Sequence, residues 1–252
     1  MMKKMLLLMV MALAVVGLAA CGGAAEEEKK VLKMGTSADF APFESRDAEG
    51  NFIGFDIELA QYIADELGYE LKIEDMKFDG LIGALQTNRV DMVLAGMSAT
   101  DKRKQNVDFS NPYNHSGEMF VTLSDSPIKS IEDLNGVMLG VQLGTIQEEG
   151  AEKINEQYDF EIKKVDNGTT LIQELMSNRI DVAYMDKAVA EGYIAEQNLA
   201  GFDDPTSSSP GMAVAFPKDS ELVEKVNDIL AKAEENGKLE ELKNKWLSEE
   251  QQ

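Results

Sequence analysis

A sequence pattern that occurs twice constrains the fold of this chain more than any other feature. LIGALQTNRVD at residues 81–91 returns as LIQELMSNRID at residues 171–181, ninety positions later. A helical pattern precedes each copy, at residues 56–67 and 146–157, and a strand pattern ending in Gly-Thr precedes each helix. Two copies at this spacing do not form a solenoid. Each half alternates strands with helices, which predicts two similar α/β lobes with mostly parallel sheets and covering helices.

The order of these segments also predicts how the chain divides between the lobes. We expect lobe 1 to contain residues 31–112 and 213–252, and lobe 2 to contain residues 118–207. Two polar crossings, at residues 113–117 and 208–212, would form the hinge between them. Both crossings contain glycine and serine, which can absorb the dihedral change of a hinge motion. The expected fold is therefore α/β, with two lobes, a two-strand hinge and a ligand cleft between the lobes.

The N-terminal segment carries a targeting signal. Lys3 and Lys4 precede an apolar run and small residues that end at Cys21, an order typical of a secretory signal and too short for a membrane span. The tetrapeptide LAAC resembles the lipobox of bacterial lipoproteins, in which the cysteine becomes the lipidated first residue. We predict a signal peptide at residues 1–20 and a flexible tether at residues 21–30, lipidated (for example with palmitate) on Cys21. The expected location is extracytoplasmic, anchored to the cell membrane.

The charge balance excludes several kinds of partner. The chain carries 46 acidic and 24 basic residues, and it has a single cysteine, so no disulfide can form within it. Such an acidic protein should avoid nucleic acid and anionic lipid. The acids suit a cationic ligand, although they could equally form a solvated surface.

A candidate anion site follows the first copy of the repeat. The apolar strand pattern at residues 90–94 breaks at Gly96, and Thr100 and Asp101 lead into a helical run that holds Arg103. In the first turn of a helix, a guanidinium lies close to unpaired backbone N–H groups and to the positive end of the helix dipole. An alternative from the same residues is that Thr100 or Asp101 caps the helix and Arg103 is a solvated surface charge.

The second copy of the repeat leads to an acidic residue instead. Aligning the two halves sets Gly96 against Asp186. Ligands of open α/β sheets bind beyond the carboxyl ends of the strands, so Arg103 and Asp186 should lie on opposite walls of one cleft. A cation and an anion that face each other suit a zwitterion.

Several separate motifs resemble those of the extracytoplasmic solute-binding proteins of ABC importers for polar amino acids. The motifs are GTSADFAPFE (35–44), GFDIELAQYIADELG (54–68), the segment 78–113, VQLGT (141–145), DVAYMD (181–186) and AFPKDSEL (215–222). The resemblance covers nearly all of residues 31–247, and LGVQLGTIQEE (139–149) together with GTSADF is similar to arginine-binding members. It implies a monomer without a cofactor that captures arginine, or alternatively lysine, histidine or glutamine, and delivers it to ABC permease subunits.

The resemblance also implies roles at the α-amino end of the ligand. Arg103 would bind the α-carboxylate, helped by Ser98 and by the turn at Thr145. Asp186 would accept the α-ammonium together with a carbonyl near Gly96. A carboxylate suits the planar fork of arginine in two parallel hydrogen bonds, and an ammonium needs only acceptors. Because Arg103 and Asp186 belong to different lobes, a ligand can bridge them only when the cleft closes as a Venus flytrap does.

The same resemblance implies five contacts with the ligand side chain. Phe40 and Phe78 would flank it, and Ser37, Asp39 and Gln147 would lie near its end. A guanidinium lying flat between the rings would gain about 0.5 to 2 kcal/mol per ring. Members that bind glutamine or histidine often carry aspartate where this chain has Ser37, which leaves the distal contact open.

Catalysis and signalling are the alternative functions. The full sequence contains no HExxH, GxSxG or P-loop pattern, and its only histidine, His115, lies in the first predicted crossing. Dehydratases of the cyclohexadienyl type resemble these binding proteins, so an enzyme on the same fold is the second hypothesis. A ligand-sensing receptor subunit is the third. Because acids near the predicted pocket suit cationic ligand groups, we expect a binding protein and no enzyme, metal or cofactor.

Overall fold

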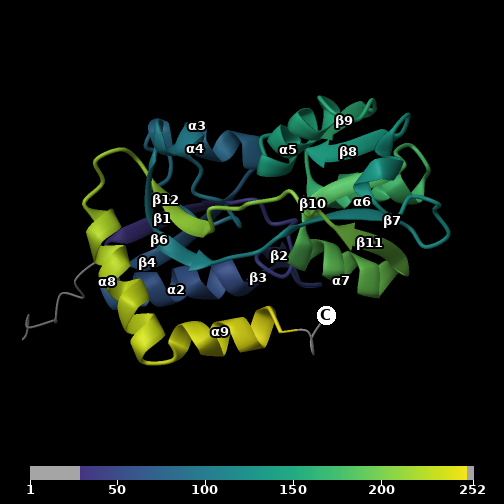
Figure 1. Ribbon diagram of the computed structural model, residues 1–252. Helices are drawn as coiled ribbons and strands as arrows, with labels where there is room; N and C mark the ends of the chain where they lie inside the picture. The colour runs from purple at the N-terminus through teal and green to yellow at the C-terminus, as the bar shows by residue number, and fades with distance from the viewer. Residues whose placement is uncertain (1–28, 249–252) are drawn as a thin grey trace, which may run out of the picture. The chain divides into compact units, whose positions relative to one another are not determined.

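The computed structural model describes residues 29–248, and two five-stranded sheets organise them (Figure 1). The first sheet has the strand order β4-β1-β5-β12-β6 and the second has the order β11-β7-β10-β8-β9. The strands of the first sheet are β1 (Val31–Thr36), β4 (Glu70–Asp75), β5 (Met92–Val93), β6 (Asp108–Asn114) and β12 (Met212–Phe216). Those of the second are β7 (Glu118–Leu123), β8 (Met138–Gln142), β9 (Glu161–Val165), β10 (Val182–Asp186) and β11 (Leu199–Asp203). A small hairpin joins β2 (Ser45–Arg46) to β3 (Phe52–Ile53).

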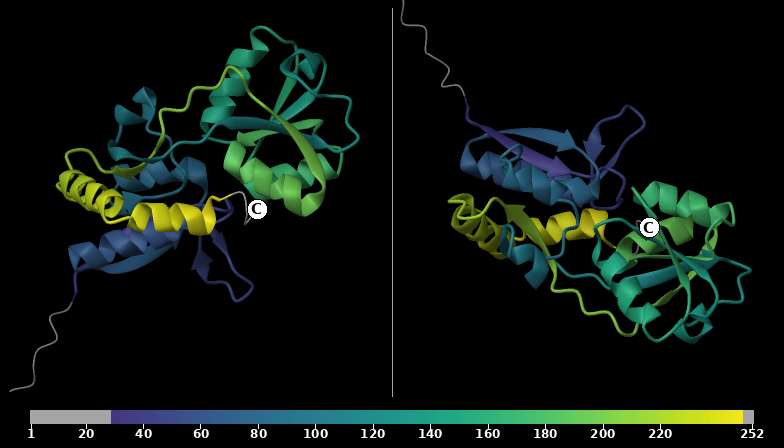
Figure 2. Two further views of the ribbon diagram at one scale, coloured as in Figure 1. Left: turned by 60° about the horizontal axis from the view of Figure 1, so that its bottom comes forward. Right: turned by 90° about the horizontal axis from the view of Figure 1, so that it is seen from above.

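Each sheet carries its own helices, and we call these two assemblies lobe 1 and lobe 2. Lobe 1 contains α2 (Phe55–Leu67), α3 (Leu81–Gln86), α4 (Asp101–Lys104), α8 (Leu222–Glu235) and α9 (Lys238–Trp246). Lobe 2 contains α5 (Ile146–Asn155), α6 (Gly168–Met176) and α7 (Lys187–Gln197). The views in Figure 2 show the helices packed on the faces of their sheets. The expected architecture of two similar α/β lobes is confirmed.

The sequence repeat is a structural repeat. Its two copies form α3 and α6, and both helices are followed by an asparagine with positive φ, Asn88 at 53° and Asn178 at 54°. The aspartate that ends each copy then accepts a backbone N–H of the neighbouring strand. Asp91 accepts from Lys33 at 2.8 Å, and Asp181 accepts from Met138 at 2.7 Å. The repeated residues therefore end a helix and fix the next strand beside its parallel partner.

The prediction of mostly parallel sheets is correct for only part of each sheet, because each sheet is mixed. The strands β4, β1 and β5 are parallel in lobe 1, and so are β9, β8 and β10 in lobe 2. The strands next to the two segments that join the lobes pair in the antiparallel sense: β12 with β5 and β6, and β7 with β10 and β11. The strand–helix–strand repeat covers only the parallel part, so it could not predict these added strands.

The two joining segments lie side by side. Met212 pairs with Asn114, and the backbone N–H of Ala99 donates to the carbonyl of Gly211 at 3.0 Å. No helix within residues 29–248 is long and apolar enough to cross a membrane. The predicted signal peptide and the lipidation at Cys21 lie outside the described residues.

Candidate functional site

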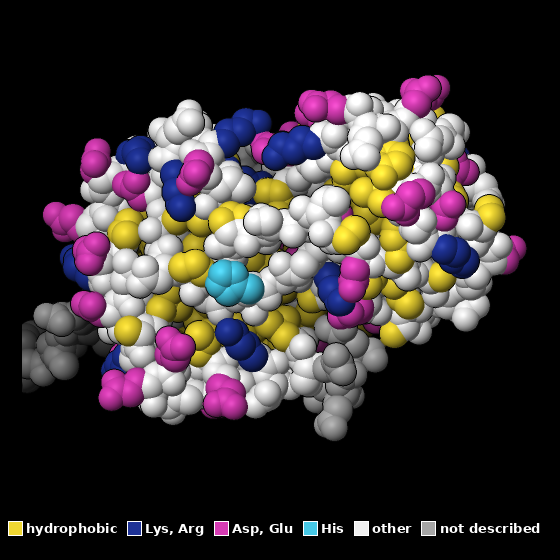
Figure 3. Space-filling view, in the orientation of Figure 1, with side chains coloured by type: hydrophobic (Ala, Val, Ile, Leu, Met, Phe, Trp, Pro, Cys, Tyr) yellow, Lys and Arg dark blue, Asp and Glu magenta, His cyan; other side chains and the backbone are white. Residues whose placement is uncertain are grey.

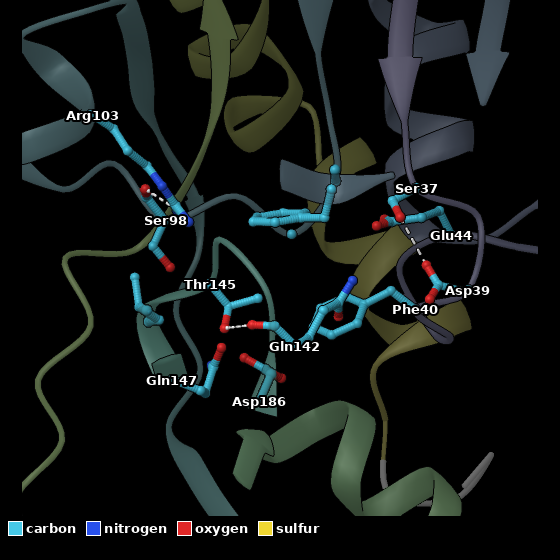
Figure 4. Close-up of a pocket in the computed structure, with 14 residues that line it drawn as sticks. Ser37, Asp39, Phe40, Glu44, Ser98, Arg103, Gln142, Thr145, Gln147 and Asp186 are labelled. Carbon is cyan, nitrogen blue, oxygen red and sulfur yellow. Dashed lines mark hydrogen bonds between the residues drawn. The ribbon is translucent and has the colours of Figure 1, made fainter. Parts of the chain in front are cut away.

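One pocket collects every residue that the sequence predicted for ligand contact. Arg103, Asp186, Ser98, Gly96, Thr145, Phe40, Phe78, Ser37, Asp39 and Gln147 all line it (Figure 4). Four further lining residues were not predicted: Glu44, Ala95, Gln142 and Ile146. The lining comes from the carboxyl-terminal ends of β1 and β5 in lobe 1 and of β8 and β10 in lobe 2, as expected for open α/β sheets.

Arg103 lies in a buried position at one end of the pocket. The helix α4 that carries it is a single turn, and the Thr100 hydroxyl accepts its backbone N–H at 3.2 Å. The capping alternative is thus correct for Thr100, but the idea of a solvated arginine is wrong, because only 8% of Arg103 is exposed. Its guanidinium donates to the carbonyls of Ser98 at 2.8 Å and Gly144 at 3.0 Å.

The charge of Arg103 has no carboxylate partner within residues 29–248. Burial lowers the pKa of its guanidinium to about 10, although the charge of Glu149, which makes no ion pair with Arg103, opposes this, so the side chain stays protonated at neutral pH. The ring of Phe78 lies 5.3 Å from the guanidinium carbon, so this ring faces the protein's own cation. A buried guanidinium without a counter-ion is suited to an anionic ligand group.

Asp186 is the matching buried acid in lobe 2. It ends β10 and caps α7, with the backbone N–H of Ala188 at 2.9 Å and the Ser116 hydroxyl at 3.0 Å both donating to Oδ1. Only 4% of Asp186 is exposed, and burial raises its pKa to about 7. Because no described lysine or arginine pairs with it, Asp186 can accept a cationic ligand group.

Gly96 forms the turn between β5 and the α4 region. Its backbone N–H donates to Asp56 Oδ2 at 2.8 Å, and its φ is +55°. A Cβ atom at this position would lie 2.9 Å from the Phe40 ring. The turn therefore favours glycine both for its backbone angle and for the close approach of Phe40.

A carboxylate that the sequence analysis missed lies at the other end of the pocket. Figure 4 shows Ser37, Asp39 and Glu44 on the side away from Arg103 and Ser98. Glu44 is 0% exposed, and neither of its carboxyl oxygens accepts a hydrogen bond from any described donor. Burial raises its pKa well above the usual range, and the nearby carboxyls of Asp56, Asp39 and Asp186 raise it further. Glu44 ends the GTSADFAPFE motif, and nothing in the sequence distinguishes it from the many surface acids.

Asp39 contacts lobe 2 directly. Its Oδ1 accepts the Ser37 hydroxyl at 2.9 Å, and its Oδ2 accepts the backbone N–H of Gly168, at the start of α6, at 2.7 Å. Burial raises the pKa of Asp39, and the Ser37 and Gly168 hydrogen bonds oppose that rise. Both carboxyl oxygens are used within the protein, so Asp39 holds the two walls of the pocket together.

Two glutamines and a threonine form the lobe 2 wall. Thr145 caps α5, and its hydroxyl donates to the carbonyl of Gln142 at 2.7 Å. Gln147 donates its side-chain amide to Glu118, a buried residue of β7. The Gln147 side chain therefore links the pocket to a further buried acid, which the sequence analysis also missed.

The acids of the pocket differ from those of the surface. Acidic and basic side chains are interspersed over the face that Figure 3 shows. On the surface of lobe 2, hydrogen bonds from Arg179 and Lys163 lower the pKa of Glu174 to about 2. Glu44 and Asp186 have no such partner, and their pKa values move in the opposite direction. Glu174 is thus a paired acid, whereas Glu44 and Asp186 are buried in the pocket without a basic partner among the described residues.

Comparisons with known proteins agree with this fold and pocket. Residues 32–249 match the family of bacterial extracellular solute-binding proteins, family 3. The chain is 45% identical over 225 residues to the arginine-binding extracellular protein ArtP of Bacillus subtilis, with 88% of each chain covered. It is 33% identical to a probable histidine-binding protein of Campylobacter jejuni, with 86% of this chain and 84% of that protein covered.

Solved structures give the same assignment. An ancestral arginine-binding protein bound to arginine superposes with a TM-score of 0.83 at 38% identity, covering 88% of this chain and all of that chain (100%). The ancestral amino acid-binding protein AncCDT-1, a precursor of cyclohexadienyl dehydratase, superposes with a TM-score of 0.80 at 35% identity, covering 86% of this chain and 96% of that one. This chain belongs to family 3 of the bacterial extracellular solute-binding proteins.

Proposed function

We propose that this chain binds an amino acid with a cationic side chain, arginine in the first place, and delivers it to an ABC permease. The observation that carries the proposal is the set of unpaired buried charges in one pocket. Arg103 lacks a carboxylate partner, and Asp186 and Glu44 lack cationic partners among the described residues. Arginine carries one anionic and two cationic groups, so each of its charges would meet one of these residues.

The α-amino end of the ligand fits between the two lobes. Arg103 of lobe 1 would hold the α-carboxylate with its planar fork, and Ser98 lies beside it in the pocket wall. Asp186 of lobe 2 would accept the α-ammonium near the Gly96 turn. A ligand held in this way contacts both lobes, so we propose that it stabilises the closed cleft.

The distal end of the pocket favours a planar cation. Glu44 offers two oxygens without donors, which match two parallel N–H groups of a guanidinium. Phe40 lines the pocket between the two ends and offers a ring face to the same group. Ser37 and Asp39 would complete this end, whereas Gln147 lies beside Thr145, away from Glu44 (Figure 4). A lysine ammonium would use Glu44 as a point charge only, which supports arginine over lysine.

The relatives support the same class of ligand without fixing it. One structural relative is an ancestral arginine-binding protein bound to glutamine, and ArtJ of Geobacillus stearothermophilus is an arginine-, lysine-, histidine-binding protein. Lysine, histidine and glutamine are therefore the competitors to test. We propose no catalysis, because the charges of the ligand account for the unpaired acids Glu44 and Asp186.

The cellular setting of the proposal comes from the sequence. We propose a monomer that is lipidated on Cys21, held outside the cytoplasm by the tether at residues 21–30, and without affinity for nucleic acid. We also propose that the hinge lies at residues 113–117 and 208–212, between lobe 1 (31–112 and 213–252) and lobe 2 (118–207).

A thermal-shift titration against single amino acids tests the proposal. Arginine should raise the melting temperature more than lysine, histidine, glutamine or leucine does. A ligand that binds only the folded state adds about 2.7 kcal/mol of stability at a hundredfold excess over its dissociation constant. A larger shift with glutamine than with arginine would contradict the role given to Glu44, and calorimetry with the same ligands would confirm the order.

A further inference from the structure

Two buried carboxyl groups lie side by side behind the distal wall of the pocket. The backbone N–H groups of Phe55 and Asp56 donate to the carbonyls of Pro42 and Phe43, at 3.0 and 2.9 Å. These bonds fix the start of α2 against the segment that carries Glu44. Both Glu44 and Asp56 are 0% exposed, but only Glu44 lines the pocket.

The two carboxyl groups differ in their hydrogen bonds. Asp56 Oδ2 accepts the backbone N–H of Gly96 and the Tyr113 hydroxyl, both at 2.8 Å. Asp56 Oδ1 and both oxygens of Glu44 accept nothing from any described donor. Two adjacent buried carboxylates without a cation cannot both be ionised. The proton should therefore sit on Glu44, from which it can be donated to Asp56. Asp56 is the better place for the negative charge, because two hydrogen-bond donors already stabilise its carboxylate.

The charged groups around Glu44 favour the same proton position. Asp56 of α2, Asp39 after β1 and Asp186 of β10 all raise the pKa of Glu44, after burial as the largest cause. Tyr113 of β6 donates its hydroxyl to Asp56. Arg103, the one lysine or arginine in the described lining of the pocket, lies at the opposite end.

We propose that the Glu44–Asp56 pair holds one proton in the empty pocket, and that a cationic side chain entering beside Glu44 displaces this proton to the solvent. The proposal rests on the proposed function. Glu44 changes from carboxylic acid to carboxylate, the buffer takes up the proton, and the ligand cation replaces it as the counter-charge. A neutral side chain leaves the proton in place. Because binding then releases a proton, the affinity for arginine rises with pH wherever the free pair is protonated and the bound pair is ionised.

Asp186 can also release a proton when a ligand binds, and the test must separate that proton from the one held by the Glu44–Asp56 pair. Its pKa is also raised, to about 7, and the α-ammonium of any amino acid would face it. Its proton release is therefore common to all α-amino acids. Citrulline has the shape of arginine without the charge, so the difference between these two ligands isolates the Glu44–Asp56 pair.

Titration calorimetry at pH 7, in two buffers with different heats of ionisation, counts the protons. We expect arginine to release about one proton more than citrulline from the wild-type protein. Glu44→Gln should abolish this excess in whatever binding it retains, and Glu240→Gln, at an exposed position of α9, should preserve it. Equal proton release by arginine and citrulline in the wild-type protein would overturn the proposal.

Infrared difference spectroscopy, arginine-bound minus free, gives a second measurement that does not require citrulline binding, because it compares the wild-type protein with Glu44→Gln and so removes the signal of Asp186 that both share. Saturation with arginine should remove a protonated-carboxyl band from the spectrum, and Glu44→Gln should lack that part of the band. A loss of protonated-carboxyl signal in the wild-type protein no larger than that in Glu44→Gln, at verified saturation of both, would overturn the proton displacement while leaving arginine binding intact. An absence of arginine binding would instead overturn the proposed function, and a free protein without any protonated-carboxyl band would overturn the shared proton itself.

Discussion

The two lobes place opposite charges at equivalent strand ends. In lobe 1, β5 leads into the Gly96 turn, and the chain continues through Thr100 before it reaches Arg103. In lobe 2, β10 ends at Asp186, which itself caps the following helix α7. The first helix is capped by a hydroxyl and presents a guanidinium, whereas the second is capped by a carboxylate.

The difference shows how a repeated lobe can build a dipolar site. The parts of the repeat that set the fold, such as Asp91 and Asp181, make the same backbone contacts in both lobes. The segments that follow the repeat differ in length before the helix begins and in the charge that they carry. The shared scaffold aims both segments at one pocket, and their difference fits a zwitterion. Three variants can break or sharpen this comparison.

The largest effect should come from the lobe 1 cation. Arg103→Lys keeps the charge but loses the fork that can form two parallel hydrogen bonds with a carboxylate. We expect arginine binding to weaken by about 2 to 5 kcal/mol, as is typical when one partner of a desolvated pair is removed. Calorimetry measures the affinity, and the melting temperature of the free protein checks the fold.

The matched control for this variant is Arg89→Lys in the same lobe. Arg89 pairs with Glu74 on the surface, where 61% of its side chain is exposed, so its substitution should leave the affinity unchanged. If Arg103→Lys bound arginine as tightly as the wild-type protein does, Arg103 could not be the carboxylate-binding residue.

A smaller loss should follow from a change to the lobe 2 anion. Asp186→Asn keeps one oxygen that can still cap α7, and it removes the charge that would face the α-ammonium. We expect a loss of about 1 to 3 kcal/mol in binding. The loss should be similar for arginine and citrulline, because both ligands carry the α-ammonium.

Asp203→Asn is the matching control in lobe 2. Asp203 pairs with Lys187 at an exposed site, so the change should cost little. An Asp186→Asn variant that discriminates between arginine and citrulline would place Asp186 at the distal end of the ligand and contradict the assignment made here.

The same comparison explains what the sequence could predict. The repeat predicted the parallel strands and their helices because its aspartates and asparagines perform local backbone tasks that any copy needs. A last strand at residues 212–216 was predicted from its apolar run and is β12, but the antiparallel pairing of β6, β7, β11 and β12 was not predicted, because it depends on where the chain crosses between lobes rather than on a local pattern.

The residues of the pocket also fall into those that a sequence pattern predicts and those that only the tertiary structure reveals. Arg103 and Asp186 were found because each follows a copy of the repeat, and the aromatic and polar lining followed from the family motifs. Glu44 and Glu118 were missed because an acid in an acidic sequence carries no signal of its own. Only their burial without a cationic partner, which depends on the tertiary structure, distinguishes them from the surface acids.

The smallest effect should be on the free energy of unfolding. It should come from Glu118, which lies next to Asp186 on the neighbouring strand of the lobe 2 sheet. Glu118 of β7 pairs in register with Asp186 of β10, and only 4% of Glu118 is exposed. Burial, and then the charge of Asp186, raise the pKa of Glu118 to about 8. A carboxyl whose pKa is higher in the folded state than in the unfolded state binds more protons when folded, so it destabilises the fold as pH rises.

Glu118 should destabilise the fold progressively as the pH rises from 4.5, its ordinary pKa, to about 8, its pKa in the folded protein. We expect Glu118→Gln to stabilise the free protein at pH 8 by a net amount on the order of 1 kcal/mol, because the weaker hydrogen bond from Gln147 offsets most of the roughly 4 to 5 kcal/mol that a pKa rise from 4.5 to about 8 is worth. The gain should shrink as pH falls and vanish about one unit below 4.5, where Glu118 is largely protonated in both the folded and the unfolded state. Urea unfolding at several pH values measures the difference. Glu161→Gln, at an exposed position of β9, is the control and should leave the free energy of unfolding unchanged at both ends of this pH range. A Glu118→Gln variant that is less stable than the wild-type protein at pH 8 would show that the hydrogen bond from Gln147 outweighs the cost of the buried charge.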